Sequence, residues 1–245
     1  MNFIIFTDLD GTLLNHDDYS FSDALPLIEK IKARNIPLIF TTSKTKKECE
    51  ILQNKMDIDM PFIVENGAAV YGMGDVDILG VRVGLIREFL EPHKDRYHIR
   101  AFYDMSVEEI MKQTGFDKEN ATLAKDREFS QPFLIEDESE LEEFRLLAKK
   151  SGFKILKGGR FYHLVSQDQD KGRAVLRVLN KIGKGKKSIA LGDNYNDLDM
   201  LKVVDIPILV PYKKDSFIDA KLPNMIKAPY TGAKGWAKAL GEIIG

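Results

Sequence analysis

Apolar and polar residues follow two different periods along the first part of the chain. Short continuous apolar runs such as FIIF and IPLIF are typical of strands that are covered on both faces. Between these runs, Leu25, Ile28 and Ile31 recur at the spacing of a helix, which we predict over residues 23–35. A second helical segment and the run PFIVE come next. The order of strand, helix, strand, helix, strand predicts a parallel sheet with helices on its faces.

The last part of the chain repeats this pattern. Residues 171–183 predict a helix, and the apolar run KSIAL predicts the strand that follows it. A short helix over 196–204, a strand over 206–210 and a closing helix over 231–244 come after that strand. Because both ends of the chain share this α/β pattern, we expect them to build one doubly wound sheet together.

The middle of the chain has a more mixed pattern. Strand-like runs such as HIRAFYDM and QPFLIE alternate with helical segments such as SVEEIMKQTG. Residues 153–166 predict a hairpin that turns at Gly158–Gly159. We therefore expect an α/β unit, residues 83–166, inserted into a core formed by residues 1–82 and 167–245.

Composition narrows the class of protein. Of 245 residues, 44% are hydrophobic and 30% are charged, as in an ordinary globular protein. The net charge of −2 gives no support for binding to nucleic acid or to a membrane surface, and we expect charge runs such as KTKKE to be solvated. A single cysteine, Cys49, excludes an internal disulfide. These features favour a cytoplasmic protein with a small-molecule partner, and they leave its oligomeric state open.

Groups that attract phosphate or a divalent metal follow the predicted strands of the core, where ligands collect in open parallel sheets. In chain order these groups are Asp8, Asp10, Thr41, Thr42, Ser43, Lys171, Asp193 and Asp197. The pair Asp8 and Asp10 in IIFTDLDGTLL is the strongest indication of a bound cation, because two carboxylates this close repel each other unless a cation lies between them. Mg²⁺ prefers oxygen ligands and usually takes one or two carboxylates together with a substrate phosphate. The sequence therefore predicts a Mg²⁺ site to which Asp8 and Asp193 contribute.

The same residues suffice to hydrolyse a phosphate ester. Asp8 attacks phosphorus to give an aspartyl-phosphate, while Asp10 protonates the leaving alcohol and then deprotonates the attacking water. Thr42 and Lys171 bind phosphate oxygens and stabilise the charge of the transition state. Each group alone also has a structural interpretation, such as a turn, a helix start or a surface lysine. The ordered set favours catalysis.

With these motifs the chain resembles the phosphatases of the haloacid dehalogenase superfamily. DLDGT matches their first motif, Thr42 the second, Lys171 the third and GDNYND the fourth. The resemblance implies a Rossmann-like core with a parallel sheet, an inserted α/β cap of the C2 type, and dependence on Mg²⁺. The implied catalytic residues are Asp8, Asp10, Thr42 and Lys171, and the candidate metal ligands are Asp8, Asp10, Asp193 and Asp197.

Segments of the insert and its flanks also resemble the mannosyl-3-phosphoglycerate phosphatases, namely KDREFSQPFL, GGRFYHL and QDKGRAV. This resemblance implies hydrolysis of mannosyl-3-phosphoglycerate to the compatible solute mannosylglycerate. Such a substrate carries a phosphate and a carboxylate, so its site needs cations beyond the metal and polar groups for the sugar hydroxyls. The candidate substrate-binding residues are Thr42, Ser43, Glu65, Asn66, Arg127, Glu128, Ser130, Gln131, Arg160 and Asn196. We interpret His163 instead as a packed sheet residue.

Three alternatives remain open at the level of sequence. The first is a broader sugar-phosphate phosphatase of the sucrose- or trehalose-phosphate type, and the second is a C2-capped phosphomutase. The third is a non-catalytic sugar-phosphate sensor, against which the presence of both Asp8 and Asp10 argues, because binding alone needs no acid/base. The choice between a mannosyl and a glucosyl ester and the metal preferred in practice also stay open.

Overall fold

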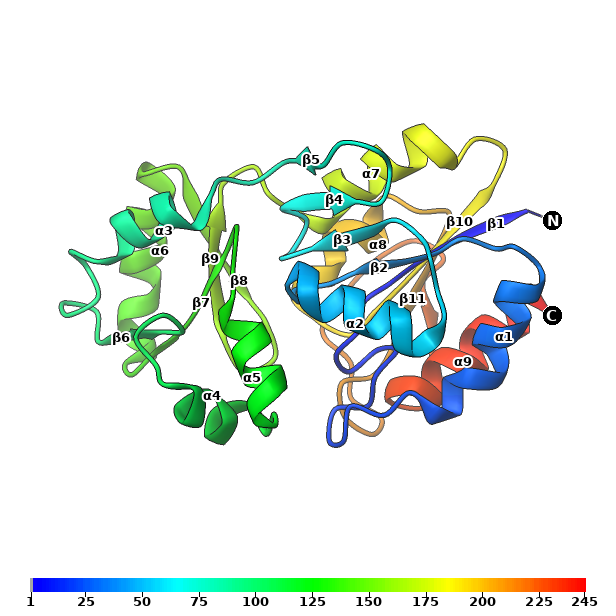
Figure 1. The fold of residues 1–245 in the computed structure, drawn as a ribbon, viewed down its shortest axis with the longest axis horizontal. Helices are drawn as coiled ribbons and strands as arrows, with labels where there is room; N and C mark the ends of the chain where they lie inside the picture. Colours follow the sequence, from blue (N-terminus) through cyan, green and yellow to red (C-terminus); the bar gives the residue numbers. More distant parts are fainter. Residues whose placement is uncertain (1) are drawn as a thin grey trace.

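Both ends of the chain contribute strands to one sheet. The computed structural model describes residues 2–245, within which eight strands form this sheet in the order β12-β11-β10-β1-β2-β3-β4-β5 (Figure 1). From β12 to β3 the neighbours are parallel, whereas β4 pairs antiparallel with both β3 and β5. The strands are β1 (Phe3–Thr7), β2 (Leu38–Thr41), β3 (Phe62–Val64), β4 (Ala69–Tyr71), β5 (Asp77–Ile78), β10 (Lys187–Gly192), β11 (Ile206–Leu209) and β12 (Ile226–Lys227). The doubly wound α/β sheet predicted from both chain ends is confirmed.

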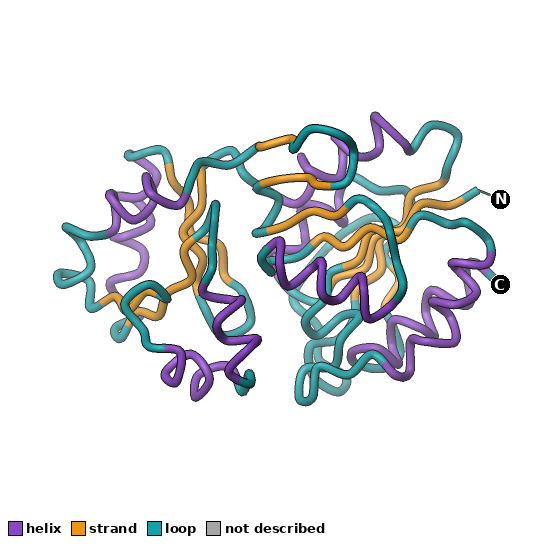
Figure 2. The backbone as a smooth tube through the Cα atoms, viewed as in Figure 1, coloured by secondary structure: helices purple, strands orange, loops and turns teal. Residues whose placement is uncertain are grey.

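Two layers of helices cover the two faces of this sheet (Figure 2). The helices of the core are α1 (Leu25–Ala33), α2 (Lys46–Met56), α7 (Lys171–Ile182), α8 (Leu198–Lys202) and α9 (Gly232–Ile244). Ile5 of β1 packs on one face in a cluster with Ile28 of α1 and Trp236 of α9. Its neighbours Ile4 and Phe6 pack on the other face in a cluster that includes residues of α7 and α8. Alternating side chains of one strand thus enter two cores, which explains the continuous apolar run in the sequence.

Within residues 2–245, three short 3₁₀ turns each lie directly before an α-helix. The helix predicted over 23–35 begins with η1 (Ser22–Ala24) and continues as α1 from Leu25. The turn η3 (Tyr195–Asp197) follows β10 and leads directly into α8. A third turn, η2 (Glu138–Glu140), lies in the insert.

The insert forms a second, smaller α/β unit beside the core (Figure 1). Within the described chain its sheet has the strand order β6-β7-β9-β8, with every neighbouring pair antiparallel. Its strands are β6 (Ile99–Ala101), β7 (Gln131–Ile135), β8 (Phe153–Lys157) and β9 (Tyr162–Ser166), and its helices are α3 (Val83–Leu90), α4 (Val107–Thr114), α5 (Lys118–Lys125) and α6 (Leu141–Lys150). The predicted hairpin is present as β8–β9. The exact boundaries of the insert, 83–166, remain a prediction.

Each unit has an apolar core of its own. In the insert, Phe133 of β7 and Leu164 of β9 pack with Phe144 of α6 and with Ile86 and Leu90 of α3. Among residues 2–245, none of the helices combines the length and the apolar character that crossing a bilayer requires.

Candidate active site

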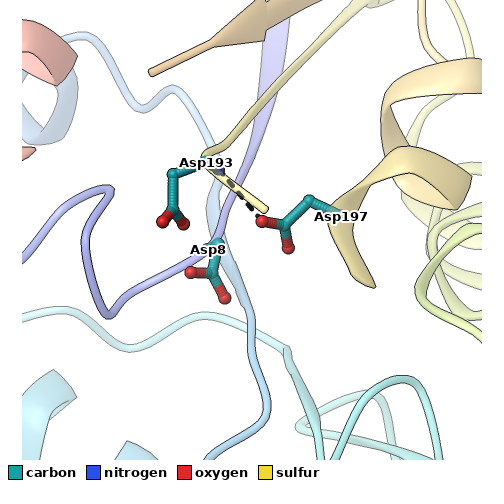
Figure 3. Close-up of side chains that lie close together, drawn as sticks. All are labelled: Asp8, Asp193 and Asp197. Atoms are coloured by element: carbon teal, nitrogen blue, oxygen red, sulfur yellow. Dashed lines mark hydrogen bonds between the residues drawn. The ribbon is translucent and has the colours of Figure 1, made fainter. Parts of the chain in front are cut away.

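Three aspartate side chains come together at the carboxyl ends of neighbouring strands. Asp8 follows β1 and Asp193 follows β10, its parallel partner, while Asp197 lies in η3. Figure 3 shows the three side chains close together, and one oxygen of each lies within 4.8 Å of the others. All three side chains are buried. The strand order therefore brings these residues together as the sequence predicted, because parallel neighbours end at the same edge of a sheet.

Two glycines leave room for this cluster. A Cβ at Gly192 would lie 2.4 Å from Cβ of Asp197, and a Cβ at Gly11, whose φ is +81°, would lie 2.7 Å from Oδ2 of Asp193. The Thr12 hydroxyl donates to Oδ1 of Asp193 at 3.0 Å, and Oδ2 of Asp197 accepts the backbone N–H of Asp193 at 3.0 Å. These contacts fix the orientation of the carboxylates.

Lys171, the first residue of α7, lies between two of the carboxylates. Its Nζ donates to Oδ1 of Asp8 and to Oδ1 of Asp197, in both cases at 2.6 Å. The Asp170 side chain caps α7 by accepting the backbone N–H of Arg173, which sets the residue at which this helix begins. Burial alone would lower the pKa of Lys171, but the charges of Asp197 and Asp8 raise it above its usual value. Lys171 therefore stays protonated.

The charge balance of the cluster fits a divalent cation. Burial, together with the charge of Asp197, raises the pKa of Asp8 to about 7 and raises the pKa of Asp193 well above its usual value. Raised values of this kind indicate carboxylates that are short of compensating positive charge. The donors are all carboxylate oxygens, which Mg²⁺ prefers. Asp8, Asp193 and Asp197 are thus the side chains that would hold Mg²⁺.

Asp10 lies apart from these carboxylates. Its Oδ1 lies 3.0 Å from Nζ of Lys44, and the same Nζ donates to Oε1 of Glu48 at 3.2 Å. Asp10 is not in the cluster of Asp8, Asp193 and Asp197, because Lys44 draws its carboxylate away from these like charges, and its part in metal binding stays a prediction.

Lys44 and Glu48 are residues that sequence reasoning missed. The charge run KTKKE was expected to be solvated, yet the side chains of Lys44 and Glu48 are only 8% and 4% exposed. Burial alone would lower the pKa of Lys44, but Asp10 and Glu48 raise it above its usual value. One signal was available: the spacing of Thr45 and Glu48 is that of a capping box, which fixes a glutamate at the start of a helix.

A cavity of about 170 Å³ lies between the core and the insert. Of the residues predicted from the sequence, its lining includes Asp8, Asp10, Ser43, Arg127, Arg160, Asp193 and Asn196. Arg160 stands exposed at the turn of the β8–β9 hairpin, so a ligand anion can reach its guanidinium. His163 of β9 is buried in the cavity wall, and burial together with the charge of Arg127 lowers its pKa to about 3. It is therefore a neutral sheet residue, as interpreted from the sequence, that also borders the cavity.

The other predicted substrate-binding residues are not among those that line the cavity in the described chain: Thr42, Glu65, Asn66, Glu128, Ser130 and Gln131. Most of them have partners that explain their position. The Glu65 carboxylate accepts the backbone N–H of Glu128 at 2.9 Å and the hydroxyl of Ser130 at 2.6 Å. Arg82 pairs with Glu128 at 2.6 Å, and Asn196 donates to Asn66 at 3.0 Å. In this structure Glu65, Glu128 and Ser130 join the insert to the core, and sugar contacts at these residues stay a prediction.

Arg127 also makes contacts with both the insert and the core. Its Nε donates to the carbonyl of Ala124 at 2.8 Å, and its Nη1 donates to the carbonyl of Ser43, which follows β2 in the core. Arg127 thus lines the cavity and at the same time ties the insert to the loop that carries Thr42.

Comparison with known proteins agrees with this geometry. A family model of haloacid dehalogenase-like hydrolases matches residues 5–218. The chain belongs to that family. It is 48% identical to a glucosyl-3-phosphoglycerate/mannosyl-3-phosphoglycerate phosphatase of Persephonella marina, and the match covers 98% of this chain and 97% of the relative. A mannosyl-3-phosphoglycerate phosphatase of Pyrococcus furiosus is 35% identical, over 84% of this chain and 90% of the relative.

The fold is also that of solved structures. A crystal structure from Thermoplasma acidophilum superposes with a TM-score of 0.78, covering 99% of this chain and 98% of that one, at 19% identity. At this identity the likeness concerns the fold alone, and it includes both the sheet of the core and the inserted unit. Phosphatases of the family use Mg²⁺, which agrees with the buried cluster of Asp8, Asp193 and Asp197.

The contacts of Glu65 predict a measurable loss of stability. We expect Glu65→Ala to lower the free energy of unfolding by about 3 kcal/mol, because the buried N–H groups of Glu128 and Phe129 and the hydroxyl of Ser130 lose their acceptor. Urea denaturation followed by circular dichroism measures the change. Ser130→Ala is the matched control, since it removes one donor and leaves the other two satisfied, at a cost of about 1 kcal/mol. Equal losses in the two variants would contradict this role of Glu65.

Proposed function

We propose that this chain is a Mg²⁺-dependent phosphatase that hydrolyses mannosyl-3-phosphoglycerate to mannosylglycerate and phosphate. The observation that carries the proposal is the carboxylate of Asp8. It is paired with Lys171 at 2.6 Å, it belongs to a buried carboxylate cluster, and it lines a cavity between the core and the insert. The names of the relatives, which act on glucosyl- and mannosyl-3-phosphoglycerate, support this choice of substrate.

Phosphoryl transfer begins at Asp8. Lys171 holds one of its carboxylate oxygens, and the other attacks phosphorus, so that an Asp8–phosphate bond forms while the bond from phosphorus to the ester oxygen breaks. Asp10, on the rim of the same cavity, gives a proton to the departing oxygen of the glycerate. When bound, Mg²⁺ reduces the repulsion between the carboxylate and the anionic phosphate.

Hydrolysis of the aspartyl-phosphate uses the same two residues, and in this step Asp10 accepts a proton instead of donating one. Asp10 takes a proton from water, whose oxygen attacks phosphorus, and the bond from phosphorus to Asp8 breaks. Lys171 and the hydroxyl of Thr42 stabilise the charge on the phosphoryl oxygens in both steps. Both aspartates end the cycle in the protonation states in which they began.

The insert supports a substrate with a second anion. Arg160 reaches the cavity from the turn between β8 and β9, on the side opposite Asp8 and Asp193 of the core. A guanidinium suits the planar carboxylate of the glycerate, to which it can donate two parallel hydrogen bonds. Ser43 and Asn196, which border the cavity from the core, offer polar groups to the sugar and the phosphate.

The test is phosphate release from a panel of esters with Mg²⁺. The panel holds mannosyl-3-phosphoglycerate, its glucosyl analogue, 3-phosphoglycerate, mannose-6-phosphate, sucrose-6-phosphate and trehalose-6-phosphate. We expect kcat/KM to favour the two glycosyl-3-phosphoglycerates by at least about 100-fold, because the simple sugar phosphates lack the carboxylate for Arg160 and 3-phosphoglycerate lacks the sugar hydroxyls. A flat profile would retain the phosphatase and reject the substrate. Absence of release from every ester would favour the mutase or the sensor.

Removal of metal provides a second prediction. We expect treatment with a chelator, followed by desalting, to lower kcat by at least about 1,000-fold, because the negative charges of Asp8, Asp193 and the phosphate then face one another uncompensated. Readdition of Mg²⁺ restores the rate, whereas readdition of Na⁺ at equal ionic strength does not. Full activity of the chelated protein would contradict the assignment of the cluster as a metal site.

A further inference from the structure

Each aspartate of the DLD segment has a buried lysine of its own. Lys171 lies between Asp8 and Asp197, at 2.6 Å from an oxygen of each. Lys44 lies between Asp10 and Glu48: it forms an ion pair with Oδ1 of Asp10 at 3.0 Å and donates a hydrogen bond to Oε1 of Glu48 at 3.2 Å. The two lysines come from different parts of the chain. Lys171 is the first residue of α7, whereas Lys44 lies between β2 and α2. Lys171 matches a motif of the family and acts in the proposed mechanism, whereas Lys44 takes no part in the steps described above.

We propose that Lys44 is a positioning residue that holds the carboxylate of Asp10 in place for proton transfer, and that Glu48 holds Lys44. This inference rests on the proposed function, in which Asp10 is the acid and base. Asp10 is the more exposed partner, with 32% of its side chain accessible, so it needs a fixed neighbour to keep one orientation toward the leaving oxygen. A misplacement of about 1 Å in a proton donor is enough to slow catalysis by about 100-fold.

Lys44 is itself fixed at both ends. Its backbone N–H donates to the hydroxyl of Thr42 at 3.1 Å. Its ammonium is held by Glu48, whose second carboxylate oxygen accepts the backbone N–H of Thr45 at 2.8 Å. That last contact is half of the capping box of α2. The start of the helix thus fixes Glu48, which in turn fixes the ammonium that faces Asp10.

The insert covers this lysine. The ring centroid of Phe116, in the loop between α4 and α5, lies 5.0 Å from Nζ of Lys44, and that of Tyr19 from the core lies 5.7 Å away. The hydroxyl of Tyr19 donates to the carbonyl of Thr114 in the insert at 3.0 Å, which holds the two rings together. Excluding water in this way strengthens the attraction between Lys44 and Asp10. Asp10 is therefore held most firmly while Phe116 of the insert covers Lys44, as it does in this structure.

The alternative role for Lys44 is direct binding of a substrate anion, since it also borders the cavity. The two roles differ in kinetics. A positioning role lowers kcat and leaves KM within about threefold, whereas loss of a substrate contact raises KM and spares kcat. We expect Lys44→Met to lower kcat by about 100-fold, the lower end of what general acid–base catalysis contributes.

A double-mutant cycle decides whether Lys44 acts through Asp10. The four proteins are the wild type, Lys44→Met, Asp10→Asn and the double variant, assayed with mannosyl-3-phosphoglycerate and Mg²⁺. If Lys44 only positions Asp10, its removal costs less than about threefold in kcat once Asp10 is already asparagine. The inference is overturned if Lys44→Met costs the same factor in both backgrounds.

Two further variants help to distinguish an effect on catalysis from a loss of folding. Glu48→Gln keeps an acceptor for the N–H of Thr45, so the capping box survives, but it removes the charge that holds Lys44. We expect a fall in kcat of about tenfold, and thermal unfolding shows whether the variant, which keeps the Lys44–Asp10 pair, is still folded at the assay temperature. Lys238→Met is the matched control, because Lys238 and Glu242 form a pair of the same spacing that is 55% and 64% exposed, and its kcat should equal that of the wild type. An unchanged kcat in Glu48→Gln would overturn the role of Glu48.

The cycle also separates this inference from the proposed function. A wild type that releases no phosphate from any ester of the panel overturns the proposed function itself. A wild type that is active, with Asp10→Asn impaired and Lys44→Met unimpaired, overturns only the role of Lys44.

Discussion

Asp8→Asn is expected to abolish phosphate release while the fold persists. We expect kcat to fall by at least about 10⁴-fold, because an amide oxygen is a poor nucleophile. The substitution keeps the shape of the side chain and an acceptor for the Nζ of Lys171, so the contact at 2.6 Å can persist. It also removes one charge from a cluster in which burial raises the pKa of Asp8 to about 7. The free energy of unfolding should therefore change by less than about 1 kcal/mol.

Phosphate release over hours at high enzyme concentration measures the residual rate, and thermal unfolding measures the fold. Asp17→Asn is the matched control, since Asp17 is an exposed aspartate in the loop just after the same motif. Its kcat should equal that of the wild type. If Asp8→Asn retains more than about one hundredth of the wild-type kcat with a native Tm, Asp8 is not the nucleophile.

The part of the site that the sequence predicted is the part that strand order determines. Asp8 and Asp193 each follow a strand of the central sheet, and parallel strands bring such positions to one edge whatever the side-chain details, while Lys171 opens the helix α7. The two-period pattern of apolar residues was enough to place β1 and β10, and thereby their terminal aspartates. The family motifs added the roles that geometry alone does not assign.

The part that escaped prediction depends on side-chain conformation and on how the two units meet. Lys44 stands in a charge run that looks solvated, and its burial depends on the aromatic rings of Tyr19 and Phe116, which come from different units. Glu65 and Ser130 are far apart in sequence, and each alone is a plausible sugar ligand. Only the docking of the insert against the core shows that they bond to each other. Local pattern carries no information about that docking.

Lys171→Met is expected to be the most destabilising of the substitutions considered. It leaves the buried carboxylates of Asp8 and Asp197 without the ammonium that lies 2.6 Å from each. Removing one partner of a buried ion pair costs about 3–5 kcal/mol, because the remaining charge keeps its desolvation penalty. Since in the proposed function Lys171 also stabilises the charge on the phosphoryl oxygens, we expect kcat/KM to fall by at least about 1,000-fold. Urea denaturation in the absence of Mg²⁺ measures the first effect, and phosphate release in its presence measures the second.

Neutralising one of the two carboxylates that Lys171→Met leaves without a partner should restore much of the stability of that variant and none of its activity. Asp197→Asn keeps the oxygen that accepts the backbone N–H of Asp193 at 3.0 Å, so the turn that follows β10 stays capped while one charge is lost. In the double variant with Lys171→Met, we therefore expect the loss in unfolding free energy to shrink by about half. Lys202→Met is the control, because its pair with Asp199 is half exposed and contributes less than about 1 kcal/mol. If Lys171→Met proves as mild as Lys202→Met, the carboxylates do not depend on Lys171 for their charge balance. If the double variant recovers activity as well as stability, Lys171 serves the fold alone.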